Sequence, residues 1–175
     1  LPLVVKPAKA GSSVGISIVD SPQKFRGAVT KASKEKSAIL VEEYIKGREV
    51  SCGVLEDITT GEVVALPPTE LIPVNAEFFD YNAKYKMGHS DEVTPAFIDE
   101  ETTKNVQEVA IWAHQVLGCR AYSRTDLLLR GSDIFILETN TLPGLTSNSL
   151  LPKAAQVAGL TFSQLLDSII TNSLG

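Results

Sequence analysis

Two carboxylate side chains near a strong turn signal could together bind a divalent cation. Apolar-rich runs flank Gly131 and Ser132, a pattern that predicts two strands joined by a tight turn. A three-residue loop at residues 131–133 would place Asp126 directly opposite Glu138. Because side chains alternate faces along a strand, one face of this hairpin would carry four polar side chains: Arg124, Asp126, Glu138 and Asn140.

The chemistry expected of this face is the binding of magnesium. Carboxylates that face each other repel unless a positive charge lies between them. Oxygen ligands such as those of Asp126 and Glu138 suit Mg²⁺, which is usually shared with the phosphates of a substrate. The alternative interpretation is the solvated edge of an ordinary hairpin.

A second candidate is a glycine-rich loop, Gly11-Ser12-Ser13-Val14-Gly15, between two predicted strands. Glycines let backbone N–H groups approach an anion closely, and serine hydroxyls add donors. Lys6, at the end of the preceding strand, could reach phosphate oxygens. The loop lacks the lysine and the spacing of a P-loop, so a tight hairpin turn remains an alternative for it. For Lys6 the alternative is a charge that protects an edge strand from pairing.

A third candidate surrounds Tyr44 and Ile45, with the carboxylates of Glu42, Glu43 and Glu49 close by in the chain. Carboxylates could accept hydrogen bonds from an adenine amino group or from ribose hydroxyls, while apolar side chains enclose the base. The alternative is a solvated strand end.

Short strands and helices must position these groups. The expected strands cover residues 3–7, 16–19, 38–44, 50–55 and 62–66, besides the hairpin. The expected helices run from Pro22 to about 33, from 99 to 117, over 151–158 and from 162 onward, with Ser21 and Thr161 as caps. Strands often neighbour strands here, which favours an α+β fold over regular βαβ alternation. The polar, aromatic segment 75–95 is predicted to be a long irregular loop with a function.

Composition narrows the class of protein. The 175 residues suffice for one well-buried core, and no apolar run approaches the length of a membrane span. A net charge of −5 argues against a nucleic-acid surface. The isolated Cys52 and Cys119 predict reduced thiols and a cytoplasmic setting, and His114 fits a structural role. Because the chain starts with Leu1 and not Met, and its first six residues already have a strand-like pattern, we expect a fragment or a processed chain.

Taken together, the motifs occur in a single order along essentially the whole chain. They are Val-Val-Lys6-Pro, the Gly-Ser-Ser-Val-Gly loop, Glu42-Glu43-Tyr44-Ile45, Phe79-Asp80-Tyr81 through Lys84-Tyr85, Arg124-Thr-Asp126, and Glu138-Thr-Asn140-Thr-Leu-Pro-Gly144 through Ser149. This order resembles the ATP-binding portion of D-alanine–D-alanine ligases of the ATP-grasp superfamily. The resemblance implies an α+β, ATP-grasp fold of antiparallel and mixed sheets flanked by helices, without its N-terminal domain. Residues 1–47 or so would be part of the central subdomain, and about 48–175 the C-terminal subdomain.

The resemblance also implies roles for individual residues. ATP would be bound by Lys6, Glu42, Glu43, Tyr44, Ile45, Glu49, Phe78 and Lys84. Two Mg²⁺ ions, for which Mn²⁺ could substitute, would be bound by Asp126, Glu138 and Asn140, with Glu138 bridging. Catalytic and orienting roles would fall to Ser12, Tyr85, Arg124, Ser149 and the backbone N–H of Gly144, and the second D-alanine would lie against Ser147, Ser149 and Leu150.

The implied activity is the ATP-dependent joining of two D-alanines through an acyl phosphate, for peptidoglycan synthesis. The implied setting is the cytoplasm, with a homodimeric full-length protein and no nucleic-acid or membrane partner. Asn148 stands where the family usually has histidine, and we expect it to alter the packing of its loop but not the chemistry. Groups that the N-terminal domain supplies for the first D-alanine have no counterpart, so the chain alone is expected to be inactive. The alternatives are another ATP-grasp carboxylate–amine ligase, a non-catalytic Mg-ATP-binding fragment and a partner-binding scaffold.

Overall fold

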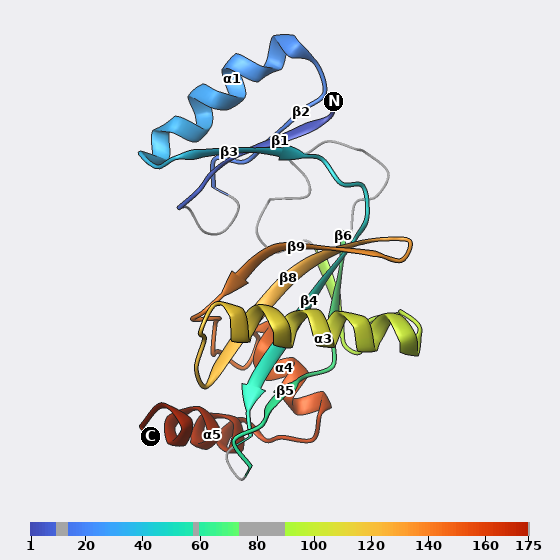
Figure 1. Cartoon of the computed structure of the whole chain (residues 1–175), viewed down its shortest axis with the longest axis vertical. Coiled ribbons are helices and arrows are strands. Elements are labelled where there is room, and N and C mark those ends of the chain that lie inside the picture. Colours follow the sequence, from blue (N-terminus) through green and yellow to red (C-terminus); the bar gives the residue numbers. More distant parts are fainter. Residues whose placement is uncertain (10–13, 58–59, 74–89, 175) are drawn as a thin grey trace. The chain divides into compact units, whose positions relative to one another are not determined.

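The computed structural model describes residues 1–9, 14–57, 60–73 and 90–174 (Figure 1). Two compact units make up the chain: Leu1–Lys46 with Pro73–His89, and Gly47–Ile72 with Ser90–Gly175. That these units correspond to the central and C-terminal subdomains of an ATP-grasp enzyme stays a prediction. Among the described residues, no helix combines the length and the apolar character needed to cross a membrane.

The first unit contains a three-stranded antiparallel sheet in the order β2-β1-β3, with one helix packed on it. Its elements are β1 (Leu3–Pro7), β2 (Ser17–Val19), α1 (Pro22–Ala32), the 3₁₀ helix η1 (Ser33–Glu35) and β3 (Ile39–Glu43). The small core joins Val5 and Val19 to Ala28 and Ala32 of α1. Strand alternation therefore turns Lys6 away from this core.

The second unit is built on a larger sheet with strand order β7-β6-β4-β8-β9, and β5 pairs with β4. The strands are β4 (Arg48–Glu56), β5 (Val63–Ala65), β6 (Thr69–Pro73), β7 (Ser90–Val93), β8 (Tyr122–Arg130) and β9 (Asp133–Asn140). The helices are α3 (Glu100–Val116), α4 (Leu150–Val157) and α5 (Phe162–Leu174). The α+β class and the ATP-grasp expectation of antiparallel sheets with helices are confirmed.

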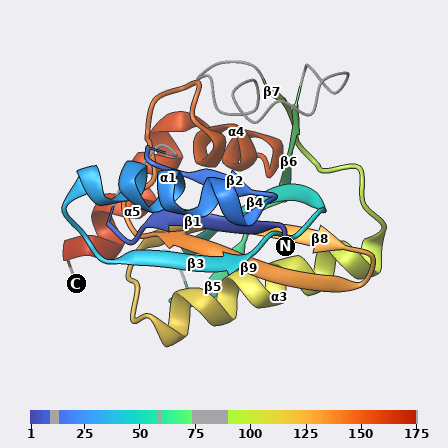
Figure 2. The same ribbon diagram turned by 90° about the horizontal axis from the view of Figure 1, so that it is seen from above.

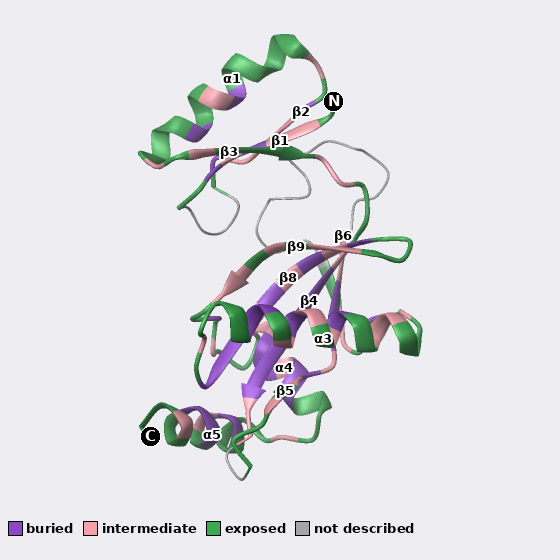
Figure 3. Ribbon diagram, viewed as in Figure 1, coloured by how far each residue is buried: buried purple, intermediate pink, exposed green. Residues whose placement is uncertain are grey.

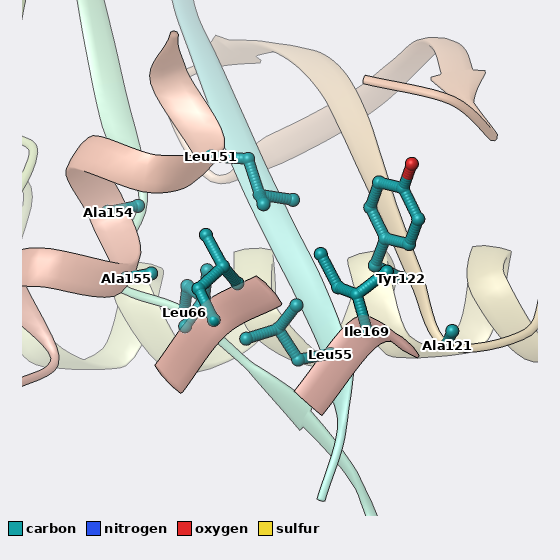
Figure 4. Packing of buried hydrophobic residues seen from close by; sticks show 9 residues of the cluster. Leu55, Leu66, Ala121, Tyr122, Leu151, Ala154, Ala155 and Ile169 are labelled. Atoms are coloured by element: carbon teal, nitrogen blue, oxygen red, sulfur yellow. The ribbon is translucent and has the colours of Figure 1, made fainter. Parts of the chain in front are cut away.

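The central strand β4 is buried on both faces because helices cover both sides of it (Figures 2 and 3). Val50, Cys52 and Val54 pack toward α3, in a cluster with Val106 and Ala110 of that helix. Leu55 points to the other face and joins a second cluster, in which α4 and α5 contribute Leu151, Ala154, Leu165 and Ile169 (Figure 4). Ser51 alternates with its neighbours and so lies on the α4 side.

The ends of the long helices follow the expected local signals. Asp99 caps α3 by accepting a hydrogen bond of 2.8 Å from the backbone N–H of Thr102. Thr161 and Gln164 form a reciprocal capping box at α5, in which each side chain accepts from the backbone N–H of the other. Ser21 occupies the N-cap position of α1 but makes no capping hydrogen bond, so Pro22 at the first position remains the local signal there.

Two strands of the second unit were not expected. β6 follows Pro67 and Pro68, which suggest a break in regular structure. β7 falls inside the segment 75–95 that the sequence predicts as irregular, and that prediction is wrong for residues 90–93. The Ser-Asp-Glu-Val sequence of β7 is polar because this strand lies at the edge of the sheet, where only one neighbour pairs with it.

Candidate functional site

The β8–β9 hairpin has the predicted register near its open end but reaches it by another route. Arg130 pairs with Asp133, so the turn contains only Gly131 and Ser132 and not three residues. Between this turn and the site, a bulge shifts the register by one residue, and Asp126 consequently pairs with Glu138.

The bulge decides which face carries the second carboxylate. With a two-residue turn and no bulge, Leu137 would stand opposite Asp126 and Glu138 would point to the α3 face. The extra residue in β9 restores Glu138 to the face of Asp126, and it places Asn140 opposite Arg124. The four predicted side chains therefore share one face, as expected.

Arg124 and Asp126 form a bidentate ion pair on that face. The Nε and Nη2 atoms of Arg124 donate to the Oδ1 and Oδ2 atoms of Asp126 at 2.9 and 2.8 Å. The two side chains are only 18% and 14% exposed, so water competes weakly for them. The positive charge expected beside the carboxylates is, in this structure, the guanidinium group of Arg124.

A third side chain, Ser51 of β4, adds another hydrogen bond to this carboxylate. Ser51 is the direct strand partner of Asp126, and its Oγ donates to Oδ1 at 2.6 Å. Sequence reasoning missed Ser51, because only the pairing of β4 with β8 brings these two residues together across 75 positions of the chain.

The electrostatics of the site keep Arg124 charged. Burial by itself would lower the pKa of Arg124, but the hydrogen bond to Asp126 and the charges of Asp126, Glu138 and Glu92 outweigh it, and the pKa is raised. Three carboxylates thus act on one guanidinium group. One of these three carboxylates, that of Glu92 in β7, was not suggested by the sequence.

The side chains on this face could supply only part of the ligands that a bound cation needs. Glu138 is exposed, and Asn140 uses its Oδ1 to accept from the backbone N–H of Leu142 at 3.2 Å. Within the described part of the chain, no group of three or more His, Cys, Asp or Glu side chains could hold a metal. Two carboxylates and an amide fit Mg²⁺ whose remaining ligands are phosphate oxygens and water.

The loop after β9 places Gly144 against Ser149, the N-cap residue of α4. The Ser149 Oγ accepts from the backbone N–H of Thr146 at 3.2 Å and lies 2.9 Å from the hydroxyl of Thr146. A Cβ atom at Gly144 would lie 2.8 Å from the Ser149 Oγ, so a side chain at this position would displace the Ser149 hydroxyl. Ser147 is exposed and lies just before α4, and Leu150 is the first residue of that helix.

In the first unit, two of the predicted ATP-binding residues contact each other. Lys6 Nζ lies 2.7 Å from Glu42 Oε2, on neighbouring strands β1 and β3. Both side chains lie on the sheet face opposite α1. Val5, the neighbour of Lys6 in β1, packs toward the helix, and alternation along the strands directs Lys6 and Glu42 to the other face. Lys6 is 16% exposed and thus held beside the more open carboxylate of Glu42.

The remaining predicted residues are placed as follows. Glu43 ends β3, and Tyr44 and Ile45 follow it as half-buried residues of the first unit. Glu49 belongs to the second unit, in β4 opposite Leu71 and Leu128. Ser12, Phe78, Lys84 and Tyr85 lie outside the described residues.

Comparisons with known proteins show to which family the chain belongs. The family model described as "D-ala D-ala ligase C-terminus" matches residues 1–171. The chain belongs to the D-alanine–D-alanine ligase family. The predicted resemblance is thereby confirmed.

Individual ligases match over nearly the whole chain. A D-alanine–D-alanine ligase of Syntrophobacter fumaroxidans is 49% identical over 99% of this chain and 55% of its own length. The ligase structure from Bacillus anthracis, also solved in complex with ATP, superposes with a TM-score of 0.81 at 35% identity, covering 99% of this chain and 54% of that one. The VanG D-Ala:D-Ser ligase structure from Enterococcus faecalis has a TM-score of 0.85 at 40% identity, covering 97% and 49%. The chain thus spans about half the length of the curated ligases it matches.

Proposed function

We propose that this chain is the nucleotide- and cation-binding portion of an ATP-dependent D-alanine–D-alanine ligase. The observation that carries the proposal is the array on one face of the second unit, where the Arg124–Asp126 pair stands opposite Asn140 and Glu138. Ligation of this kind transfers the negatively charged γ-phosphoryl group of ATP to a carboxylate oxygen, and oxyanion charge then develops at the tetrahedral centre formed by amine attack. The partly buried guanidinium group of Arg124, with carboxylates beside it, suits that chemistry.

The reaction has two steps. The carboxylate of the first D-alanine attacks the γ-phosphorus of ATP, the bond to the β-phosphate oxygen breaks, and an acyl phosphate and ADP result. The amine of the second D-alanine then attacks the acyl carbon and loses a proton, and inorganic phosphate leaves. Acyl phosphates hydrolyse readily, so water must be excluded during both steps.

In this proposal Arg124 holds negative charge at the acyl centre. A guanidinium group has five N–H donors, and Asp126 takes two of those of Arg124. No other residue that the structure describes accepts from this guanidinium group, so its other three N–H donors remain for a developing oxyanion or phosphate. Arg124 can therefore bind substrate without releasing Asp126. The backbone N–H of Gly144 would serve the same charge.

Asp126, Glu138 and Asn140 would hold two Mg²⁺ ions. When bound, the ions neutralise phosphate charge and polarise the phosphoryl group. Lys6 and Lys84 would contact phosphates, and Glu42, Glu43, Tyr44, Ile45, Glu49 and Phe78 would surround adenine and ribose. To do so, Lys6 would have to leave Glu42, which it contacts in this structure, and bind a phosphate oxygen instead.

Substrate contacts belong to the α4 end of the site. Ser147, Ser149 and Leu150 would line the second D-alanine, and Ser12 and Tyr85 would orient the substrates with Ser149. The hydroxyl of Ser149, held by Thr146, is a fixed acceptor or donor at this place. Action in the cytoplasm as a homodimer is part of the same proposal.

The test uses the protein encoded by the complete gene, incubated with Mg-ATP and D-alanine. We expect ADP and D-alanyl-D-alanine in equal amounts, and loss of both products in the Asp126→Ala variant. A preference for any other pair of amino acids would refute the D-alanine assignment. Nucleotide binding that Asp126→Ala and Glu138→Ala leave unchanged would instead favour a scaffold.

A second candidate is an acceptor other than D-alanine. The likeness to VanG, a D-Ala:D-Ser ligase, favours D-serine as this alternative. Competition between D-alanine and D-serine for the acceptor position, followed by mass spectrometry of the dipeptides, separates the two. A dipeptide that contains mainly D-serine would support the alternative.

A further inference from the structure

Ser51 has a buried hydroxyl that serves the Asp126 carboxylate. The residue is 3% exposed and lies in the central strand β4, directly paired with Asp126 of β8. Its Oγ donates to Asp126 Oδ1 at 2.6 Å. A buried hydroxyl needs such a partner, because an unsatisfied one costs about 1–3 kcal/mol.

The hydrogen bonds of Asp126 leave one place for a further ligand. A carboxylate offers about four acceptor positions, two on each oxygen. Oδ1 accepts from Ser51 and from the Nε of Arg124, which uses both of its positions. Among the described residues, Oδ2 accepts only from the Nη2 of Arg124, so one position on Oδ2 remains.

The donors come from two strands, and this fixes the plane of the carboxylate. Arg124 is two residues from Asp126 on β8, so this bond by itself ties the carboxylate only to its own strand. Ser51 adds an anchor on β4, across the sheet. A rotation of the carboxylate about its Cβ–Cγ bond would break the short bond to Ser51.

We propose that Ser51 is a positioning residue for cation binding at this site. With Arg124, its hydroxyl occupies Oδ1 and directs Oδ2 of Asp126 toward the cation. The inference rests on the proposed function, because it takes Asp126 as a ligand of Mg²⁺. Partners of metal ligands typically change metal affinity by 10- to 100-fold when they are removed, and a loss of about 10-fold or more is expected here.

The test compares Ser51→Thr with Ser51→Val. The two side chains have nearly the same shape, but only threonine keeps a hydroxyl. Mn²⁺ affinity is measured from the EPR signal of free Mn²⁺, in the complete protein with a non-hydrolysable ATP analogue. We expect Ser51→Thr to bind Mn²⁺ within about 3-fold of the parent, and Ser51→Val to bind about 10- to 100-fold more weakly.

Ser123→Ala is the matched control. Ser123 is also a buried serine in the sheet, but its hydroxyl lies 2.8 Å from His114 Nδ1, in a cluster apart from the carboxylate. We expect this variant to bind Mn²⁺ like the parent. If Ser51→Val does not fold, the smaller Ser51→Ala replaces it, with Ser51→Thr as the variant that restores the hydroxyl.

The Asp126→Ala variant tests the proposed cation site separately from the role of Ser51. If it weakens Mn²⁺ binding while the valine and threonine variants bind equally well, the role of Ser51 is refuted and the proposed cation site stands. If Asp126→Ala leaves Mn²⁺ binding unchanged, the cation site itself is refuted, and the inference about Ser51 with it. A weaker affinity in Ser51→Val alone, with Ser51→Thr unaffected, supports the inference.

Discussion

Gly47, at the start of the second unit, has no room for a side chain. A Cβ atom built there would lie 2.4 Å from the carbonyl oxygen of Leu129 and 3.0 Å from its carbonyl carbon. Both atoms are backbone of β8, the strand that carries Arg124 and Asp126, so they cannot turn aside as a flexible side chain can. We predict that Gly47→Ala forces β4 and β8 apart and destabilises the second unit by about 1–3 kcal/mol, the usual cost of overpacking.

The chain contains a matched control. Gly27 is an interior residue of α1, and a Cβ atom there would meet nothing within 4 Å. Since alanine is the better helix former, Gly27→Ala should stabilise the protein by about 0.5–1 kcal/mol. The two substitutions add the same methyl group and are predicted to have opposite signs.

Urea unfolding followed by circular dichroism measures both effects, with tryptophan fluorescence from Trp112 of α3 as a local probe of the second unit. Gly47→Ala should lower the midpoint of that fluorescence transition, and Gly27→Ala should leave it near the parent value. An unchanged midpoint for Gly47→Ala would show that β4 and β8 tolerate the Cβ atom. The predicted clash between a Cβ atom at Gly47 and the backbone of Leu129 would then be refuted.

Three further predictions concern individual side chains. Arg124→Met should reduce ligase turnover by about 10²–10³-fold, as loss of an oxyanion donor does, with a smaller effect on the KM for ATP; equal turnover would refute its role. The Glu92–Lys153 ion pair of 2.7 Å joins β7 to α4. Glu92→Gln should raise the KM for the second amino acid, and the exchanged pair Glu92→Lys with Lys153→Glu should restore it if the pair acts as a tie between the two elements. If the exchange fails to restore it, the negative charge of Glu92 beside Arg124 is the active feature. Burial raises the pKa of Cys52 to about 12, so at pH 8 a thiol reagent should modify only Cys119 until the protein unfolds, and rapid modification of both thiols would contradict the buried position.

Local structure is what the sequence by itself determined. Helix caps and helical periodicity act within a few residues, and so α3 begins and ends close to the predicted positions, and α5 begins at its predicted residue. The alternation in the hairpin placed Arg124 and Asp126 on one face for the same reason. The order of the motifs along the chain was enough to indicate the family, because each motif is a short run of residues.

Tertiary structure decided the contacts that make the site specific. Pairing of β4 with β8 brings Ser51 to Asp126, and pairing of β1 with β3 brings Lys6 to Glu42. Neither partnership has a signal in the chain, since it depends on which strands lie side by side. The edge strand β7 escaped prediction because its polar residues form a strand only when β6 offers a partner.

The bulge in β9 illustrates the difference most clearly. The sequence predicted Asp126 opposite Glu138 through a three-residue turn, and the pairing is right although the turn is not. A tight turn at Gly131 and Ser132 alone would have sent Glu138 to the α3 face. Only the packing of the finished sheet, with apolar residues of β8 and β9 against α3 and carboxylates away from it, decides where the extra residue is accommodated.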